Sequence, residues 1–234
     1  MADSAPQQIE VWGDLGCFTR PELKVERLSY PFITPSAARG IFDAIYWKPA
    51  FRWIIRRVEL LSPPRFIALR RNEVQSNPLN ERNLNQWMSG SAEVTPLFAD
   101  EERTQRQTMA LKALRYRLTA EIRPRAGGAG AVMSMIAQFR RRAGRGQCFH
   151  QPSFGCREFP AYFRLIEPGE ALDAPVAVDI DAGWMVFDTF AASGAEANTA
   201  PAEIHVFHAQ ARGGVVDVPV PESPLVRRPG GGRG

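Results

Sequence analysis

The sequence predicts an α+β fold, and three observations support this prediction. Short segments in which apolar residues alternate with polar ones are typical of β-strands, and they account for much of the chain. Residues 37–47 and 131–143 instead have the composition and apolar spacing of helices. With 234 residues, 44% hydrophobic and 23% charged, the chain is long enough to bury a sizeable core.

Apolar periodicity and proline define the elements expected in the first half of the chain. They are a strand over 8–12, a helix over 37–47, strands over 52–61 and 65–74, and an exposed, asparagine-rich excursion over about 75–102. Ile9 and Val11 share one face of the first strand. Pro35 stands at the start of the helix, Pro49 lies beyond its end, and Pro63 separates the next two strands.

The second half continues with a long strand and a second helix. The predicted elements are a strand over 104–122, a glycine-rich loop over 124–130, a helix over 131–143, a strand over 159–166, and short strands over 176–180, 184–187, 204–207 and 215–218. In the long strand, Arg115 and Arg117 lie on one face, with Tyr116 and Leu118 on the other. This order of strands and helices suits a ferredoxin-like (RRM-like) domain with a small β-rich C-terminal part.

These elements suggest three regions of unequal size. Residues 1–166 form the expected ferredoxin-like domain, which includes the excursion. Residues 167–218 form the small β-rich region, and residues 219–234, rich in proline and glycine, form a flexible tail.

The net charge of +4 conceals one strongly basic segment. Residues 103–145 carry 11 basic side chains and one acidic side chain, Glu121, for a net charge of +10. Residues 1–102 have a net charge of −1 and residues 146–234 one of −5. The basic residues are 26 Arg and 3 Lys, a bias that genome composition alone can produce. A concentrated cationic segment would repel itself in isolation, so it indicates a polyanionic partner such as a nucleic acid.

Several function classes lack support in the sequence. No apolar run approaches 18 residues, so no transmembrane helix is expected, and residues 1–8 lack the pattern of a signal peptide. Cys17, Cys148 and Cys156 form an odd, dispersed set, which favours a reduced, cytoplasmic location and disfavours a zinc site. There is no phosphate-binding Gly-x-x-x-x-Gly-Lys motif, and His205 and His208 are expected on opposite faces of a strand. We therefore expect no metal and no cofactor.

Several motifs, in order, resemble a known family. They are Gly13-Asp14-Leu15-Gly16-Cys17-Phe18-Thr19-Arg20-Pro21-Glu22, Pro35-Ser36-Ala37-Ala38-Arg39-Gly40-Ile41, Ala44-Ile45-Tyr46-Trp47-Lys48-Pro49, Arg70-Arg71-Asn72-Glu73-Val74, Phe139-Arg140-Arg141-Arg142-Ala143 and Gly155-Cys156-Arg157-Glu158-Phe159-Pro160. Together they resemble the fifth CRISPR-associated (Cas) protein family of type I-C systems, which belongs to the repeat-associated RNA-binding superfamily. The resemblance covers about residues 8–190.

The resemblance implies a subunit of the crRNA-guided Cascade complex. Such a subunit grips the 5′ repeat-derived handle of crRNA and contacts the seventh-family Cas backbone subunit and the large and small subunits. It meets target DNA only through the complex, and no membrane is involved. In type I-C systems it also cuts precursor crRNA without a metal, when a ribose 2′-OH attacks the adjacent phosphate.

The cleavage chemistry requires a base, an acid and a cation near the phosphate. The resemblance places a family tyrosine at Tyr46, whose hydroxyl Lys48 could activate. Related members carry a Lys-His pair in the helix before the arginine run, where this chain has Ser134 and Met135. Either His150, Lys112 or an arginine supplies the missing roles, or the protein binds the RNA without cutting it.

The predicted RNA-binding residues come from the basic segment and from the family motifs. They are Phe18, Arg20, Arg39, Arg71, Arg106, Arg115, Arg117, Arg140, Arg141, Arg142, Arg145 and Gln147. A third hypothesis, a small-molecule enzyme, is opposed by the concentrated positive charge and by the absence of a clustered acid–base pair.

Overall fold

The computed structural model describes residues 5–23, 25–74, 81–91, 103–125, 129–190 and 203–228. Its elements, in chain order, are β1 (Gln7–Gly16), β2 (Arg27–Leu28), α1 (Pro35–Ile45), β3 (Phe51–Leu60), β4 (Phe66–Val74), α2 (Glu81–Met88), β5 (Arg103–Pro124), a 3-10 turn (Ala129–Ala131), α3 (Val132–Ala143), β6 (Tyr162–Leu165), β7 (Ile180–Phe190), β8 (Glu203–Ala211) and β9 (Val215–Asp217). Among the described residues, no helix has the length and apolar character needed to span a bilayer.

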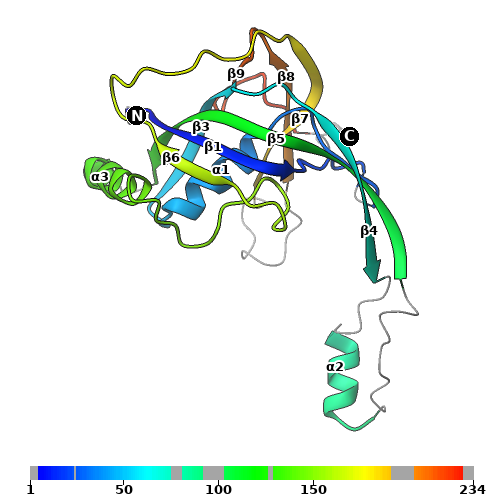
Figure 1. The fold of residues 1–234 in the computed structure, drawn as a ribbon. Coiled ribbons are helices and arrows are strands. Elements are labelled where there is room, and N and C mark those ends of the chain that lie inside the picture. The colour runs from blue at the N-terminus through cyan, green and yellow to red at the C-terminus, as the bar shows by residue number, and fades with distance from the viewer. Residues whose placement is uncertain are drawn as a thin grey trace.

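The main sheet has the strand order β6-β1-β5-β3-β9 (Figure 1). Its first four strands pair antiparallel, and α1 and α3 each connect two of them. This is the ferredoxin-like arrangement, because β1 and β3, which α1 connects, are separated by β5, and β5 and β6, which α3 connects, are separated by β1. The predicted α+β, ferredoxin-like fold is therefore confirmed.

Aromatic packing joins both helices to the sheet. Phe42 of α1, Trp53 of β3 and Phe139 of α3 meet with ring centroids 4.7–5.5 Å apart, and all three side chains are fully buried. Thr34 caps α1 by accepting a hydrogen bond from the Ala37 N–H at 3.2 Å. The core of the domain thus lies between α1, α3 and one face of the sheet.

Strand β5 spans 22 residues and changes partners near its middle. Its second part pairs with β1 and β3, and its first part pairs with β4 and with the short, parallel β2. The change occurs at Ala113, whose φ of 53° lies in the left-handed region. Ser62 bridges the irregularity: its hydroxyl donates to the Ala113 carbonyl and accepts from the Arg115 N–H.

The C-terminal region is joined to the main sheet and to α1. β9 pairs with β3, while β7 and β8 form a separate hairpin. Asp188 of β7 is buried and accepts two hydrogen bonds from Arg39 (2.8 and 3.0 Å) and one from Arg52 (2.6 Å). Each arginine side chain is only about a quarter exposed, and the Asp188 carboxylate compensates its charge. The ion pairs therefore hold the hairpin against α1 and β3.

Several local features differ from the sequence predictions. The predicted excursion contains helix α2, which its asparagine-rich composition concealed, and its residues 75–80 and 92–102 lie outside the described part. Residues 176–179, predicted as part of a strand, are irregular, although the Val176 N–H donates to the Leu60 carbonyl. Residues 219–228, assigned to a flexible tail, make ordered contacts, since Arg227 exchanges two backbone hydrogen bonds with Val206.

We predict that Asp188→Asn lowers the free energy of unfolding by about 2–3 kcal/mol, because Arg39 and Arg52 lose the carboxylate that compensates their buried charge. The exposed pair Arg57–Asp217 provides the control, and Asp217→Asn should cost no more than about 0.5 kcal/mol. Urea denaturation of both variants measures the difference. Equal stabilities would show that the Asp188 cluster contributes no more than a surface ion pair.

Candidate nucleic-acid interface

The last turn of α3 and the segment that follows it cover the C-terminal end of α1. The last turn of a helix leaves carbonyl groups without intrahelical partners. Here the Ala44 carbonyl accepts from the Phe149 N–H at 2.7 Å, and the Ile45 carbonyl accepts from Arg142 Nε at 2.8 Å. The negative end of the helix dipole also favours a cation at this position. Arg142 and Phe149 are therefore held against α1.

Exposed rings and cations gather around this end of α1. The Arg142 guanidinium lies 4.0 Å from the ring centroid of Phe149, which is 62% exposed. Arg125 lies beside the loop that follows α1, because its N–H donates to the Ala50 carbonyl. The resulting surface, called here the α1-end surface, consists of Trp47, Lys48, Arg125, Arg142, Arg145, Phe149 and His150.

The charge of the α1-end surface is available to a ligand. Within the described parts of the chain, Lys48, Arg125, Arg142 and Arg145 have no carboxylate partner. Uncompensated cations beside exposed aromatic rings are the combination that binds single-stranded nucleic acid, with phosphates on the cations and bases on the rings.

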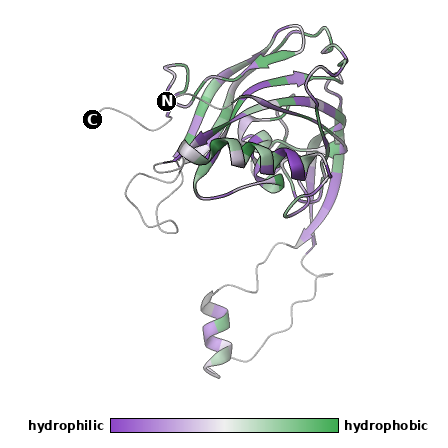
Figure 2. Cartoon of the chain, turned by 90° about the vertical axis from the view of Figure 1, so that its left-hand side faces the viewer, coloured by the Kyte–Doolittle hydropathy of each residue, from purple (hydrophilic) through white to green (hydrophobic). Residues whose placement is uncertain are grey.

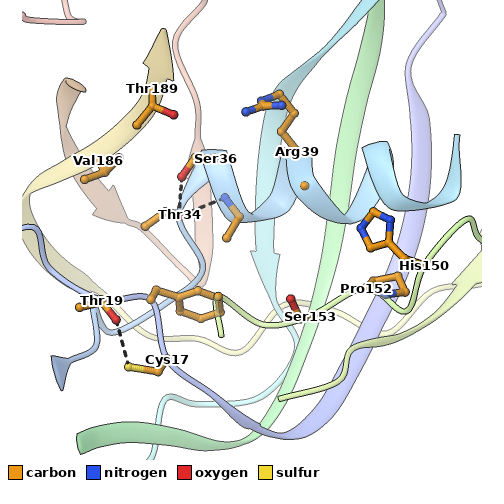
Figure 3. A pocket seen from close by; sticks show the side chains of 14 residues that line it. Cys17, Thr19, Thr34, Ser36, Arg39, His150, Pro152, Ser153, Val186 and Thr189 are labelled. Carbon is orange, nitrogen blue, oxygen red and sulfur yellow. Dashed lines mark hydrogen bonds between the residues drawn. The ribbon is translucent and has the colours of Figure 1, made fainter. Parts of the chain in front are cut away.

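His150 connects this surface to a cleft of ≈ 480 Å³ along α1 (Figure 3). Figure 3 shows the imidazole beside α1, across the cleft from β7. Hydroxyl groups of Thr19, Ser36, Ser153 and Thr189 contribute to the lining. The cleft thus combines an exposed imidazole with several neutral hydrogen-bonding groups.

Arg39 also lines the cleft, but its charge is compensated. Its guanidinium pairs with Asp43 at 2.5 Å and with Asp188 at 2.8 Å. Burial acts to lower the pKa of Arg39, and the two carboxylates raise it above its ordinary value. Burial also raises the pKa of Asp43. Arg39 therefore remains a cation whose main partners are carboxylates of this chain.

The predicted pair Arg115 and Arg117 lies on the opposite face of the sheet. Arg115 donates to Glu10 at 2.5 Å and to Asp173 at 2.7 Å. Arg117 is buried at 6% exposure, and its guanidinium binds Glu59 and the Asp173 backbone carbonyl. Because the flanking acidic segments supply these carboxylates, neither arginine presents an uncompensated charge in this conformation.

Other predicted arginines are paired in the same way. Arg140 binds Glu167, Arg71 binds Glu158, and Arg20 stacks over the Tyr30 ring at 4.5 Å. Five of the predicted RNA-binding residues are exposed or half-buried and have no carboxylate partner in the described part of the chain: Arg106, Arg141, Arg142, Arg145 and Gln147.

The predicted catalytic residues are not all brought together. Tyr46 is only 3% exposed, and its ring packs on Phe51 with centroids 5.4 Å apart. Lys48 Nζ lies 6.0 Å from the centroid of the Tyr46 ring. Lys112 is exposed on β5, where its N–H donates to Arg65, and no described contact joins it to the other candidates. Of the four, only Lys48 and His150 belong to the α1-end surface.

The ring of Phe18, a predicted RNA contact, belongs to the core. It is 2% exposed and makes edge contacts with Tyr116 and Phe154. At the positions of the family's Lys-His pair, Ser134 is exposed and donates to the Ala131 carbonyl, while Met135 is buried at 6% exposure. Met135 therefore contributes to packing rather than to a surface.

Two of the cysteines, dispersed in sequence, are close in space. The Cys156 thiol approaches the Cys17 carbonyl at 3.8 Å. Hydrogen bonding from Cys156 lowers the pKa of Cys17 to about 6, against the effect of burial, and raises the pKa of Cys156. The described residues contain no group of three or more side chains suited to a metal ion. His205 is buried and His208 exposed on β8, which confirms their predicted placement on opposite faces.

Sequence reasoning missed Phe149 and Arg125 as members of the surface. Phe149 directly precedes His150 and follows the arginine run, but nothing local shows that its N–H binds α1. Arg125 ends the long strand, and only the pairing of β3 with β5 brings it beside the loop after α1.

Comparison with known proteins decides the family. Residues 8–219 match the family described as "CRISPR-associated protein (Cas_Cas5)", in its Cas5d form. This chain belongs to the Cas5 family. It is 41% identical over 220 residues to the "CRISPR pre-crRNA endoribonuclease Cas5d" of Mannheimia succiniciproducens, covering 91% of this chain and 94% of that protein. A protein of the same name from Thermus thermophilus is 40% identical over 181 residues, covering 77% of this chain and 72% of that one.

Solved structures show the same fold as this Cas5 protein. One, described as a CRISPR-associated protein, has a TM-score of 0.66 at 20% identity and covers 97% of this chain and 98% of that one. A functionally uncharacterized protein from Streptococcus mutans has a TM-score of 0.64 at 19% identity and covers 97% of this chain and 99% of that one. The resemblance inferred from the sequence motifs is thus confirmed at the level of family and fold.

We predict that Gly155→Ala destabilises the fold by more than about 2 kcal/mol. Gly155 has a φ of 83°, and an added Cβ would lie 2.0 Å from the Cys17 carbonyl oxygen. Gly146 is the matched control, since its φ is 64° but open space surrounds it, so Gly146→Ala should cost about 1 kcal/mol. Thermal and urea unfolding compare the variants. Equal losses of stability in the two variants would mean that the close approach of residue 155 to the Cys17 carbonyl adds no cost of its own.

Proposed function

We propose that this Cas5 protein binds the 5′ repeat-derived handle of crRNA and cleaves precursor crRNA without a metal ion. The α1-end surface carries the proposal, because its cations are uncompensated and lie beside exposed rings and an imidazole. The names of the two relatives, both pre-crRNA endoribonucleases, support the same activity. The protein acts in the cytoplasm as a type I-C Cascade subunit, beside the seventh-family backbone subunit and the large and small subunits, and meets target DNA through them.

The proposed reaction is an internal transesterification. The ribose 2′ oxygen attacks the adjacent phosphorus, the bond from phosphorus to the 5′ oxygen breaks, and the products are a cyclic phosphate and a 5′-OH. The exposed imidazole of His150 exchanges protons with these oxygens as the general acid–base group. Lys48, Arg142 and Arg145 stabilise the charge that develops on the phosphate. His150 is assigned in preference to Tyr46 because the imidazole is exposed and the Tyr46 side chain is buried.

A second candidate function is handle binding without cleavage. It is favoured by one observation: Ser134 and Met135 stand where the resemblance to the family implies a Lys-His pair, and Met135 is buried. The two candidates share the same RNA surface and differ only in the chemical step, so a cleavage assay separates them.

We predict that purified protein cleaves a repeat hairpin RNA in EDTA, and that His150→Gln lowers the single-turnover rate by about 10²–10⁴-fold. His208→Gln, an exposed histidine on β8, should leave the rate unchanged, and so should Tyr46→Phe. Gel analysis of the products measures each rate. No product from the wild-type protein would favour the binding-only candidate, and a large loss only with Tyr46→Phe would return the role to that tyrosine.

RNA binding should weaken steeply with salt because phosphate contacts release counterions. We predict that Arg145→Ala reduces the slope of log affinity against log salt by about 0.7, the value for one phosphate contact on a single strand. Arg212→Ala, an exposed arginine beside β9, should leave the slope unchanged. Fluorescence anisotropy with labelled handle RNA at several salt concentrations measures both. A salt-independent wild-type affinity would contradict an electrostatic RNA interface.

A further inference from the structure

A second pocket, of ≈ 600 Å³, is lined by residues that do not belong to the α1-end surface and come from other elements. It is formed where β2 lies beside the first part of β5, at the start of the ribbon made by β4 and β5 (Figure 1). Its lining includes Leu23, Leu28, Arg70, Gln105, Gln107 and Met109. Figure 2 shows that hydrophilic residues predominate toward the end of this ribbon.

Strand register places the polar groups of the pocket on one face. Gln105, Gln107 and Met109 alternate along β5, so their side chains share a face. Arg70 of β4 pairs directly with Gln107, and Leu28 of β2 pairs with Met109. Cross-strand partners point to the same side, so the guanidinium, the two amides and the apolar groups converge.

The polar groups of this pocket are free to bind a ligand. Within the described residues, no hydrogen bond engages the side-chain amides of Gln105 and Gln107, and Arg70 has no ion-pair partner. The carboxylate of Glu26 is already occupied, because it accepts the Gln107 backbone N–H at 2.7 Å. Arg27 is paired with Glu158 at 3.1 Å. Among the described residues, Arg70 is therefore the cation of the pocket that has no ion-pair partner, while the Glu26 carboxylate is held by a backbone N–H rather than by a cation.

The apolar part of the pocket is exposed in the absence of a ligand. Leu23 is 37% exposed and Met109 is 38% exposed. An exposed apolar floor, neutral amides able both to donate and to accept, and one unpaired guanidinium match the three parts of a nucleotide. The floor suits the face of a base, the amides suit its Watson–Crick edge, and the guanidinium suits a phosphate.

We propose that this pocket binds one unpaired nucleotide of the RNA and reads its base. The base lies on Leu23, Leu28 and Met109, its edge bonds to Gln105 and Gln107, and its phosphate binds Arg70. This proposal rests on the proposed function, since it assigns a second contact to the same RNA. It gives the protein a base-specific contact that the phosphate-binding α1-end surface does not supply.

An abasic scan of labelled handle RNA tests the proposal. Each unpaired nucleotide is replaced in turn by an abasic one, and affinity is measured for wild-type protein and for Gln107→Leu. We expect one position at which loss of the base weakens wild-type binding about tenfold. Gln107→Leu should weaken binding of the intact RNA by a similar factor, and the two losses should not add, because both remove one contact. Arg70→Ala should weaken binding of the intact RNA as well.

The control is Gln210→Leu, a glutamine on β8 outside the pocket, which should leave every affinity unchanged. Melting temperatures equal to wild type show that the variants fold. Binding of intact RNA with no abasic position coupled to Gln107 would overturn the pocket while leaving the proposed function standing. Failure of the wild-type protein to bind RNA would overturn the proposed function itself. If Gln107→Leu binds RNA with unchanged affinity but no longer copurifies with another Cascade subunit, the pocket binds a protein instead of a nucleotide.

Discussion

The pairing of β5 is the constraint on which the rest of the structure depends. This strand would measure about 70 Å if fully extended, and it pairs with four other strands. Its second part closes the ferredoxin-like sheet, and its first part carries the ribbon and the second pocket. The two parts are separated where Ala113 adopts a positive φ, at a cost of about 1–2 kcal/mol that the Ser62 hydrogen bonds help to offset. The strand therefore carries part of the second pocket, and Arg125 of the α1-end surface directly follows it.

Compensation of charge by tertiary pairing decides which arginines remain available. The basic segment has a net charge of +10 in sequence, yet Arg115, Arg117 and Arg140 are neutralised by carboxylates from segments before and after it. The Glu10 carboxylate of β1 pairs with Arg115 of β5 on one side and with Arg164 of β6 on the other. Ion pairs with one buried partner stabilise a specific strand register. The arginines in these pairs are not available to bind phosphate. Some arginines of the basic segment thus stabilise the sheet, and others remain available to bind a ligand.

Periodicity predicted the fold well because its elements are locally determined. The alternation around Ile9 and Val11 and the proline that begins α1 can each be recognised from neighbouring residues alone. The candidate site could be predicted only in part. His150 and Arg142 were named. The burial of Phe18, however, follows from packing with Phe154, far away in sequence, and the burial of Tyr46 follows from the fold that packs its ring on Phe51 of β3. Pairing partners such as Asp188 for Arg39, 149 residues apart, leave no local pattern. Charge counts along a chain therefore locate basic segments but not exposed charge.

The place of β1 in the sheet has a consequence for synthesis of the chain. β1 lies between β5 and β6, and its register joins Gln7 to Ala120 and Trp12 to Tyr162. On the ribosome, the apolar residues Ile9 and Val11 emerge more than 100 residues before their partners in β5, Leu118 and Tyr116, have been made. Such long-range pairing slows folding and leaves a strand edge open to other chains. The nascent protein thus depends on its N-terminal strand staying unassociated until the second half of β5 has been made.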